Sequence, residues 1–338
     1  MKTVVFGASG YAGAEVLRLA ANHSEIEVVA AVAESNAGKR VADHQPALAG
    51  VYPDLTFVDT ETALLLDFEV AFLALPHGHS QPLVKTLRSR EVQCVDLGAD
   101  FRLKDSATFE QWYGAKHEAT ELLSNAVYGL VERHRDELRG AQLIASPGCY
   151  PTATALAIGP FVDAGWVERS GLIVNALSGA SGAGRATQDR LHFSRLASNA
   201  EAYGLSSHRH TPEMEQEIGA QILFTPHLIP AARGMLVTAY AKLTPRAGGT
   251  NEAIELLWAT YVNDPFVVVT DDPPTLKDPV GSNICFVHAK VDSRTNTLIM
   301  MSSIDNLIKG AAGQAIQAWN VACGFPETMA LPMSGVTP

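Results

Sequence analysis

A glycine-rich turn between an apolar strand and a helix, at the start of the chain, constrains the fold more than any other feature. Gly7, Gly10 and Gly13 follow a strand expected over residues 3–6 and precede a helical run expected over 14–22. Glycines at this spacing permit a tight turn and let backbone N–H groups approach a pyrophosphate at the helix start. The plainer alternative is a glycine-rich turn that binds nothing. The turn predicts a dinucleotide site, with contacts expected from Gly7, Ser9, Gly10, Tyr11, Ala12 and Gly13.

The apolar segments divide the chain into two parts. Before Cys149, buried strands alternate with helical stretches, which is typical of βαβ units and a parallel sheet. These strands are expected at 26–33, 70–75, 92–96 and 143–145. Beyond Cys149 the strands follow one another more closely and are less uniformly apolar, which favours a mixed or antiparallel sheet. They are expected at 172–177, 223–229, 235–243, 266–269, 284–291 and 298–304.

The predicted fold class is α/β, with an N-terminal Rossmann-type parallel sheet plus an α+β domain that holds the mixed or antiparallel sheet. A chain of 338 residues fits two domains. The first is expected over 1–148, completed by a C-terminal helix and tail over 306–338, and the second over 149–305. Helices are expected in addition at 152–164, 251–261 and 307–321.

Charge and apolar content narrow the classes of partner. The net charge of −11 argues against nucleic acid or an anionic membrane as the main partner. No apolar run reaches the length that spans a bilayer, and the N-terminus lacks the pattern of a secretory signal. The four cysteines form no CxxC pair, so no metal site is expected. These features predict a cytoplasmic protein with reduced cysteines. The net charge does not exclude an anionic small molecule as ligand, because a local basic pocket can lie on an acidic protein.

Cys149 is the candidate nucleophile. It lies in the segment SPGCYPTA over 146–153, where an apolar strand breaks at Pro-Gly and a helix begins. Unpaired N–H groups and the positive end of the helix dipole favour the thiolate there. Cys94 and Cys285 lie in expected strands, where a free cysteine acts as a small apolar residue. A nucleotide fold with a poised cysteine indicates hydride transfer through a thioester.

The residues after the second strand leave the type of cofactor open. Glu34 lies about 20 residues beyond Gly13, where a carboxylate normally holds a ribose 2′-OH and favours NAD. Ser35, Lys39 and Arg40 follow directly and are suited to a 2′-phosphate, which favours NADP.

Motifs in order along almost the whole chain identify a family. The chain resembles the N-acetyl-gamma-glutamyl-phosphate reductases of arginine biosynthesis, which are related to the aspartate-semialdehyde dehydrogenases. The matching stretches are GASGYAGAE at 7–15, ALPHGHS at 74–80, DLGADFRL at 96–103, SPGCYPTA at 146–153, SGASGAGR at 178–185, HRHTPE at 208–213, RGM at 233–235 and DNLIKGAAGQA at 305–315. The resemblance implies an NADP-binding Rossmann domain, a catalytic and oligomerisation domain that forms a homodimer or homotetramer, and Cys149 as nucleophile. Glu34 departs from what an NADP pocket leads one to expect.

The resemblance also implies a reaction. The Cys149 thiolate attacks an acyl phosphate, phosphate leaves, and hydride from the nicotinamide reduces the thioester to an aldehyde. Proton transfer suits histidine, whose pKa lies near neutrality; His208 and His210 are the candidates, with His208 preferred and Glu213 as an orienting group. The guanidinium group of arginine can bind two oxygens of an anionic substrate at once. The substrate contacts expected are Arg102, Ser178, Gly179, Arg185 and Arg209. The further cofactor contacts expected are Pro76, Asn306 and Gly310.

Two alternatives stay open at the level of the sequence. A relative could act on another acyl phosphate, such as aspartyl phosphate, and the aldehyde that supports phosphate-dependent cofactor reduction distinguishes the two. A dinucleotide-sensing regulatory protein would bind the cofactor without turnover, and alkylation of Cys149 would not affect it.

Overall fold

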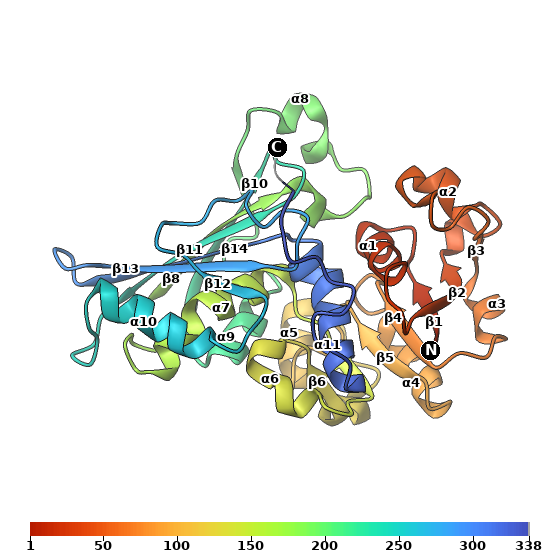
Figure 1. Cartoon of the computed structure of the whole chain (residues 1–338), viewed down its shortest axis with the longest axis horizontal. Helices are drawn as coiled ribbons and strands as arrows, with labels where there is room; N and C mark the ends of the chain where they lie inside the picture. The colour runs from red at the N-terminus through yellow and green to blue at the C-terminus, as the bar shows by residue number, and fades with distance from the viewer. Residues whose placement is uncertain (337–338) are drawn as a thin grey trace. The chain divides into compact units, whose positions relative to one another are not determined.

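The computed structural model describes residues 1–336 and divides them into two units (Figure 1). The first unit holds residues 1–147 and 311–331, and the second holds 148–310 and the described part of the tail from 332. The chain therefore leaves the first unit after residue 147, returns to it over 311–331 with a single helix, and leaves it again at 332. The return segment is shorter than the 306–338 expected from the sequence, because 306–310 and the tail belong with the second unit.

A seven-stranded sheet, parallel throughout, forms the centre of the first unit. Its strand order is β3-β2-β1-β4-β5-β7-β6. The order reverses between β1 and β4, and such a switch point is where open parallel sheets bind ligands, outside the carboxyl ends of the strands. The strands are β1 Lys2–Phe6, β2 Glu27–Val32, β3 Phe57–Val58, β4 Val70–Leu73, β5 Gln93–Asp96, β6 Ala126–Tyr128 and β7 Leu143–Ala145.

Helices cover both faces of this sheet because its strands are apolar on both sides. On one face Leu73 and Cys94 belong to a core cluster that includes Val84 and Leu87 of α4. On the other, the Phe72 ring lies 6.1 Å from the Trp319 ring of α11, and Trp319 Nε1 donates to Gln93 Oε1 at 2.9 Å. The helices are α1 Tyr11–Ala20, α2 Val41–His44, α3 Thr60–Leu64, α4 Ser80–Ser89, α5 Ser106–Tyr113, α6 Val131–Leu138 and α11 Gly313–Cys323.

The second unit is built on a mixed seven-stranded sheet with the order β12-β13-β14-β11-β8-β10-β9. β8 pairs with β10 and β12 with β13 in parallel, and the other neighbours are antiparallel. The strands are β8 Leu172–Gly179, β9 Glu201–Ala202, β10 Ile222–Ile229, β11 Met235–Lys242, β12 Val267–Val269, β13 Cys285–Asp292 and β14 Thr297–Ile304. The two sheets confirm the predicted fold class.

Three helices pack on one face of the second sheet (Figure 1). They are α7 Cys149–Asp163, α9 Thr211–Ile218 and α10 Thr250–Tyr261, while the short α8 Phe193–Leu196 lies outside this layer. Side chains alternate along β8 and β10: Val174 and Phe224 are buried, whereas their neighbours Ile173 and Leu223 are 41% and 58% exposed. One face of this sheet therefore carries apolar side chains that the chain itself does not cover.

The C-terminal helix differs from its prediction at the start. A continuous helix is expected from residue 307, but Ile308–Ala312 forms a π-helix and α11 begins only at Gly313. The short strands β3, β6 and β9 have no counterpart among the predicted strands, because two or three residues are too few to show a period. Within residues 1–336, no helix is both long and apolar enough to cross a bilayer.

Candidate active site

The glycine turn of the first unit has the shape of a phosphate cradle. Gly7 adopts φ 71°, and a Cβ atom there would collide with the carbonyl of Ala74. A Cβ atom on Gly13 would collide with the backbone of Gly7 and Ala8. Gly10 is the N-cap of α1, and no side chain caps this helix. An uncapped helix start beside a turn that only glycine can form suits a pyrophosphate.

Contacts from neighbouring segments hold the cradle in place. Ala8 N–H donates to the Val32 carbonyl of β2 at 2.9 Å, and Gln45 Nε2 donates to the Ala8 carbonyl at 3.0 Å. His44 Nε2 lies 3.3 Å from the Ser9 carbonyl oxygen. Sequence reasoning missed Gln45, since a glutamine after a short helix carries no motif.

A carboxylate fixes the loop between β4 and α4, which contains Pro76. Asp100 accepts from Gly78 N–H at 2.7 Å and from Ser80 N–H at 3.0 Å. Ser80 Oγ donates to Asp96 Oδ1 at 2.8 Å. Burial first, and the neighbouring charge of Asp100 second, raise the pKa of Asp96 to about 7. The sequence motif DLGADFRL marked this stretch, but the support that it gives to the loop appears only in the structure.

Arg102 braces two strand ends of the first unit. It is 7% exposed, its Nε donates to the Ser146 carbonyl at 2.8 Å, and its Nη2 donates to the Leu97 carbonyl at 2.8 Å. The guanidinium expected to bind substrate therefore also holds the segments after β5 and β7 together.

Cys149 is the first residue of α7 in the second unit. Its N-cap, Gly148, has no side chain to cap the helix, and Gly148 N–H donates to the buried carboxylate of Glu213 at 2.9 Å. A Cβ atom on Gly310 would lie 2.7 Å from the Cβ of Cys149. Glu213 and Gly310 thus set the position of the Cys149 backbone and side chain. Gly310 was expected to contact the cofactor, and its contact with the cysteine carried no sequence signal.

The four free cysteines differ in their surroundings. Cys94 and Cys285 are buried, and burial raises the pKa of Cys94 to about 12 and that of Cys323 to about 11. The thiols of Cys94 and Cys323 therefore stay protonated at neutral pH. Cys149, by contrast, is half-buried at a helix N-terminus, which favours the thiolate. Residues 1–336 contain no group of three or more His, Cys, Asp or Glu side chains able to hold a metal ion.

Two histidines and two tyrosines cluster in the unit that carries Cys149. The rings of His208 and His210 lie 5.0 Å apart, and the Tyr150 ring lies 5.3 Å from His208 and 6.0 Å from His210. The hydroxyls of Tyr150 and Tyr203 are 2.8 Å apart. Because Tyr150 follows Cys149 directly, the structure brings the predicted histidines to the start of α7. Tyr203 was not among the predicted site residues.

Geometry separates the two histidines. The backbone N–H of His210 donates to His208 Nδ1 at 3.1 Å, so a neutral His208 carries its proton on Nε2. Burial, followed by the charge of Arg209, lowers the pKa of His208 to about 4, so this imidazole is neutral at pH 7. A ring whose Nδ1 already accepts and whose Nε2 already carries a proton is poorly suited to take up another one.

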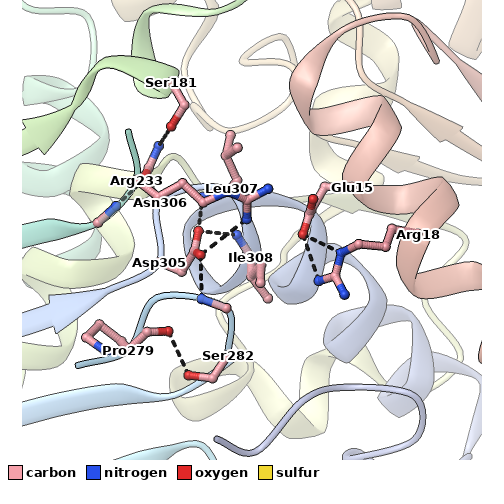
Figure 2. A network of polar contacts seen from close by, with 12 residues as sticks. Glu15, Arg18, Ser181, Arg233, Pro279, Ser282, Asp305, Asn306, Leu307 and Ile308 are labelled. Carbon is pink, nitrogen blue, oxygen red and sulfur yellow. Dashed lines mark hydrogen bonds and ion pairs between the residues drawn. The ribbon is translucent and has the colours of Figure 1, made fainter. Parts of the chain in front are cut away.

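A polar network connects the SGASGAGR loop to the segment after β14 (Figure 2). Asn306 Nδ2 donates to Ser181 Oγ at 2.9 Å, and Asn306 Oδ1 accepts from Gly234 N–H at 2.8 Å. Asp305 is fully buried and pairs with Arg233 at 3.3 Å. Asn306 and Gly310 therefore lie in the same unit as Cys149.

The remaining predicted substrate residues belong to two loops of the second unit. Ser178 is buried near the end of β8, and a Cβ atom on Gly179 would lie 2.9 Å from the backbone of Arg233. Arg185 and Arg209 are exposed. Arg209 lies next to His208 in the chain, and its charge acts on that imidazole.

Two family models match separate stretches of the chain, one before Cys149 and one from Cys149 onward. The model of the semialdehyde dehydrogenase NAD binding domain matches residues 2–141, and that of the semialdehyde dehydrogenase dimerisation domain matches 149–306. Proteins named N-acetyl-gamma-glutamyl-phosphate reductase are similar over the full length. That of Moorella thermoacetica is 42% identical and covers 100% of both chains. That of Pelotomaculum thermopropionicum is 43% identical over 100% of this chain and 99% of its own.

Solved structures show the same fold at low identity. Aspartate semialdehyde dehydrogenase II of Vibrio cholerae, complexed with ASA, superposes with a TM-score of 0.71 at 15% identity and covers 95% of this chain and 97% of its own. Aspartate semialdehyde dehydrogenase with NADP from Candida albicans gives 0.67 at 16% identity and the same coverage.

Proposed function

The chain belongs to the N-acetyl-gamma-glutamyl-phosphate reductase family of semialdehyde dehydrogenases, and from this premise we propose that it reduces N-acetyl-gamma-glutamyl phosphate to N-acetylglutamate 5-semialdehyde and phosphate in arginine biosynthesis. The observation that carries the proposal is the half-buried Cys149 thiol at the uncapped start of α7, in a chain of this family. Its cofactor is a nicotinamide dinucleotide.

Cys149 is the proposed nucleophile. Its thiolate attacks the carbonyl carbon of the acyl phosphate, the C–O bond to phosphate breaks, and inorganic phosphate leaves with the electron pair. A thioester results. The bound dinucleotide supplies one hydride. Addition of the hydride to the thioester carbonyl leaves an oxyanion, which takes up a proton to give the thiohemiacetal. That hydroxyl proton is then removed, the C–S bond breaks with its electron pair going to sulfur, and the aldehyde and the thiolate separate. Backbone N–H groups at the start of α7 are suited to stabilise the oxyanion.

His210 is the proposed proton-transfer group in place of His208, which the sequence favoured. The Nδ1 atom of His208 accepts the N–H of His210, so His208 keeps its proton on Nε2 and orients its neighbour. Glu213 accepts from Gly148 N–H, and its proposed role is to position the start of α7 and with it Cys149.

The 2′-phosphate of NADP is the proposed discriminating group of the cofactor, with Lys39 and Ser35 as its partners. Both side chains are exposed beyond the end of β2, the strand that pairs with β1. Arg40 pairs with Asp43 at 2.7 Å, so Lys39 is the cation better placed to serve.

The substrate is anionic at two ends, and arginine suits both of them. We assign Arg185 and Arg209 to its carboxylate and phosphate, and Ser178 and Gly179 to the loop beside it. Arg102, already bonded to two carbonyls, acts chiefly on the strand ends. We further propose a homodimer or homotetramer through the second unit and a cytoplasmic location.

The test measures reduced nicotinamide by absorbance in the reverse direction. N-acetylglutamate semialdehyde with inorganic phosphate should support reduction of NADP, and aspartate semialdehyde should not. Turnover with the aspartate compound alone would replace the proposed substrate, and cofactor binding without turnover of either would indicate a sensor.

The proposed thioester is tested by removing or trapping the Sγ atom of Cys149. Cys149→Ala should bind the dinucleotide as the wild type does and lose turnover to background. The wild type, incubated with acyl phosphate in the absence of dinucleotide, should accumulate an acyl adduct on Cys149, seen by mass spectrometry.

His210→Asn should lower kcat by about a hundredfold, and His208→Asn should lower it less. The opposite order would return the proton transfer to His208.

A further inference from the structure

An acidic residue stands where a 2′-phosphate would have to bind. Glu34 follows β2 directly, and Ala8 N–H of the glycine cradle bonds to Val32 at the end of the same strand. In dinucleotide-binding sheets, a carboxylate at this place accepts from the ribose 2′-OH of NAD. A free carboxylate there would repel the additional phosphate of NADP.

The Glu34 carboxylate is engaged on the other side of β2. Its Oε1 accepts from Thr60 N–H at 3.0 Å and from Thr60 Oγ1–H at 2.5 Å. Thr60 begins α3, the helix that follows β3. Because the strand order is β3-β2-β1, Thr60 lies across β2 from the cradle of β1. The hydroxyl and the N–H therefore draw the carboxylate oxygen away from the cofactor side.

The N–H of Thr60 is bonded to Glu34 and not to the N-cap residue of α3. Asp59, the N-cap, accepts from Thr62 N–H at 2.7 Å, so it serves a different donor of the first turn. Carboxylates near a helix N-terminus are favoured by its dipole. Two acids thus share the first turn of α3, and one of them is the residue that would otherwise face the ribose.

The cation available to a phosphate is Lys39, which is exposed and whose carbonyl accepts from Phe57 N–H of β3 at 2.9 Å. Lys39 Nζ lies 3.2 Å from Asn36 Oδ1, and Asn36 Nδ2 lies 3.4 Å from Ser35 Oγ. These exposed, weakly held groups can rearrange around a phosphate at small cost. Arg40, by contrast, makes two bonds to Asp43, at 2.7 and 3.1 Å.

We propose that Thr60 is a positioning residue for cofactor choice: by holding Glu34, it converts an NAD-type strand end into one that accepts the 2′-phosphate on Lys39 and Ser35. The inference rests on the proposed use of NADP by this enzyme. It assigns a role to Thr60, which belongs to no dinucleotide motif, through its contact with Glu34.

The test is the ratio of the dissociation constants of NADH and NADPH, measured by titration calorimetry on the full-length protein without substrate. Thr60→Val removes the hydroxyl and frees Glu34, so the ratio should fall by about threefold to tenfold. Thr60→Ser keeps the hydroxyl and should keep the ratio. Glu34→Gln removes the charge and should raise the ratio by a similar factor, and Lys39→Ala should weaken NADPH alone, by about tenfold or more.

The double variant separates positioning from general damage. If Thr60 acts through Glu34, then Thr60→Val added to Glu34→Gln should leave the ratio of Glu34→Gln unchanged. An equal fall of the ratio in both backgrounds, or no fall in either, would overturn the inference. Glu34→Gln tests the same link without altering α3, so a poorly folded Thr60→Val does not block the experiment. A protein that shows these ratios but does not turn over the N-acetylated substrate would refute the proposed function and leave this inference standing.

Discussion

At the scale of single residues, the reactive thiol is placed by neighbours that carry no reactive group. Gly310 leaves room for Cys149 where any other side chain would meet it, and Gly148 caps α7 with only a backbone N–H bound to Glu213. The position of the sulfur depends on these contacts as much as on the cysteine itself.

Gly310→Ala should therefore impair catalysis more than folding. The new Cβ would lie 2.7 Å from the Cβ of Cys149, so the nucleophile must move by several tenths of an ångström. We expect kcat to fall by at least about tenfold, since small displacements of reacting groups are costly. Gly50→Ala is the matched control, because the space around that position is open. Equal kinetics for both variants would mean that α7 adjusts freely.

Asp96 gives the first unit a pH-dependent stability. Its pKa is about 7 in the folded state against a usual 3.8, so between pH 4 and 7 the folded state keeps a proton that the unfolded chain loses. The contribution of this group to the free energy of unfolding is therefore greatest at low pH and falls as the pH rises through 7. Asp96→Asn should remove that dependence.

The measurement is urea unfolding at pH 5 and pH 8. Relative to the wild type, Asp96→Asn should gain roughly 2 kcal/mol in the free energy of unfolding between the two pH values. A fixed offset from the new amide is expected at both and does not affect the difference. If the two proteins change in parallel, Asp96 is ionised throughout.

At the scale of elements, Asp305 joins three segments at the end of β14. Its Oδ1 accepts from Leu307 N–H at 2.8 Å and from Ile308 N–H at 3.2 Å, and its Oδ2 accepts from Gly281 N–H at 2.8 Å beside Arg233. One buried carboxylate thus fixes the entry to the π-helix.

Asp305→Ala should destabilise the second unit by about 3–5 kcal/mol, because buried donors and a guanidinium lose their partner. Thermal unfolding followed by circular dichroism would detect this as a lower midpoint. Glu255→Ala, on the exposed side of α10, should shift the midpoint little. A small effect of Asp305→Ala would mean that water replaces the carboxylate.

Elements with a strong period could be predicted from the sequence, and contacts across the chain could not. The apolar strands 70–75 and 235–243 emerge as β4 and β11 because each alternates or is wholly apolar. Cys149 at a helix start could be predicted, since Pro-Gly before an apolar run marks the boundary. The two bonds from Thr60 to Glu34 join residues 26 apart, and no local rule foresees them.

At the scale of the whole molecule, the exposed apolar side chains of the second sheet are the proposed surface for assembly with another copy of the chain. Ile173 and Leu223 are adjacent in register on β8 and β10, and both are exposed apolar residues. Contiguous apolar surface of this kind marks interfaces. The matching family model describes this part of the chain as a dimerisation domain.

Leu223→Lys should weaken assembly, because it buries a charge without a partner in the interface. Light scattering after size exclusion should show a smaller molar mass for the variant at concentrations where the wild type is assembled, with a dissociation constant raised by at least about tenfold. Val262→Lys, 70% exposed at the end of α10, is the control and should not change the mass. An unchanged mass for Leu223→Lys would place the interface elsewhere.

The discontinuous first unit has a consequence for biosynthesis. A ribosome completes residues 1–147 long before it adds 311–331, so the nascent sheet waits without Trp319 against Phe72 and Gln93. During that interval residues 148–310 of the second unit are translated. The sheet that is made first thus waits for almost the whole chain, and a message truncated before residue 311 would yield a first unit without its C-terminal helix and a second unit without its tail.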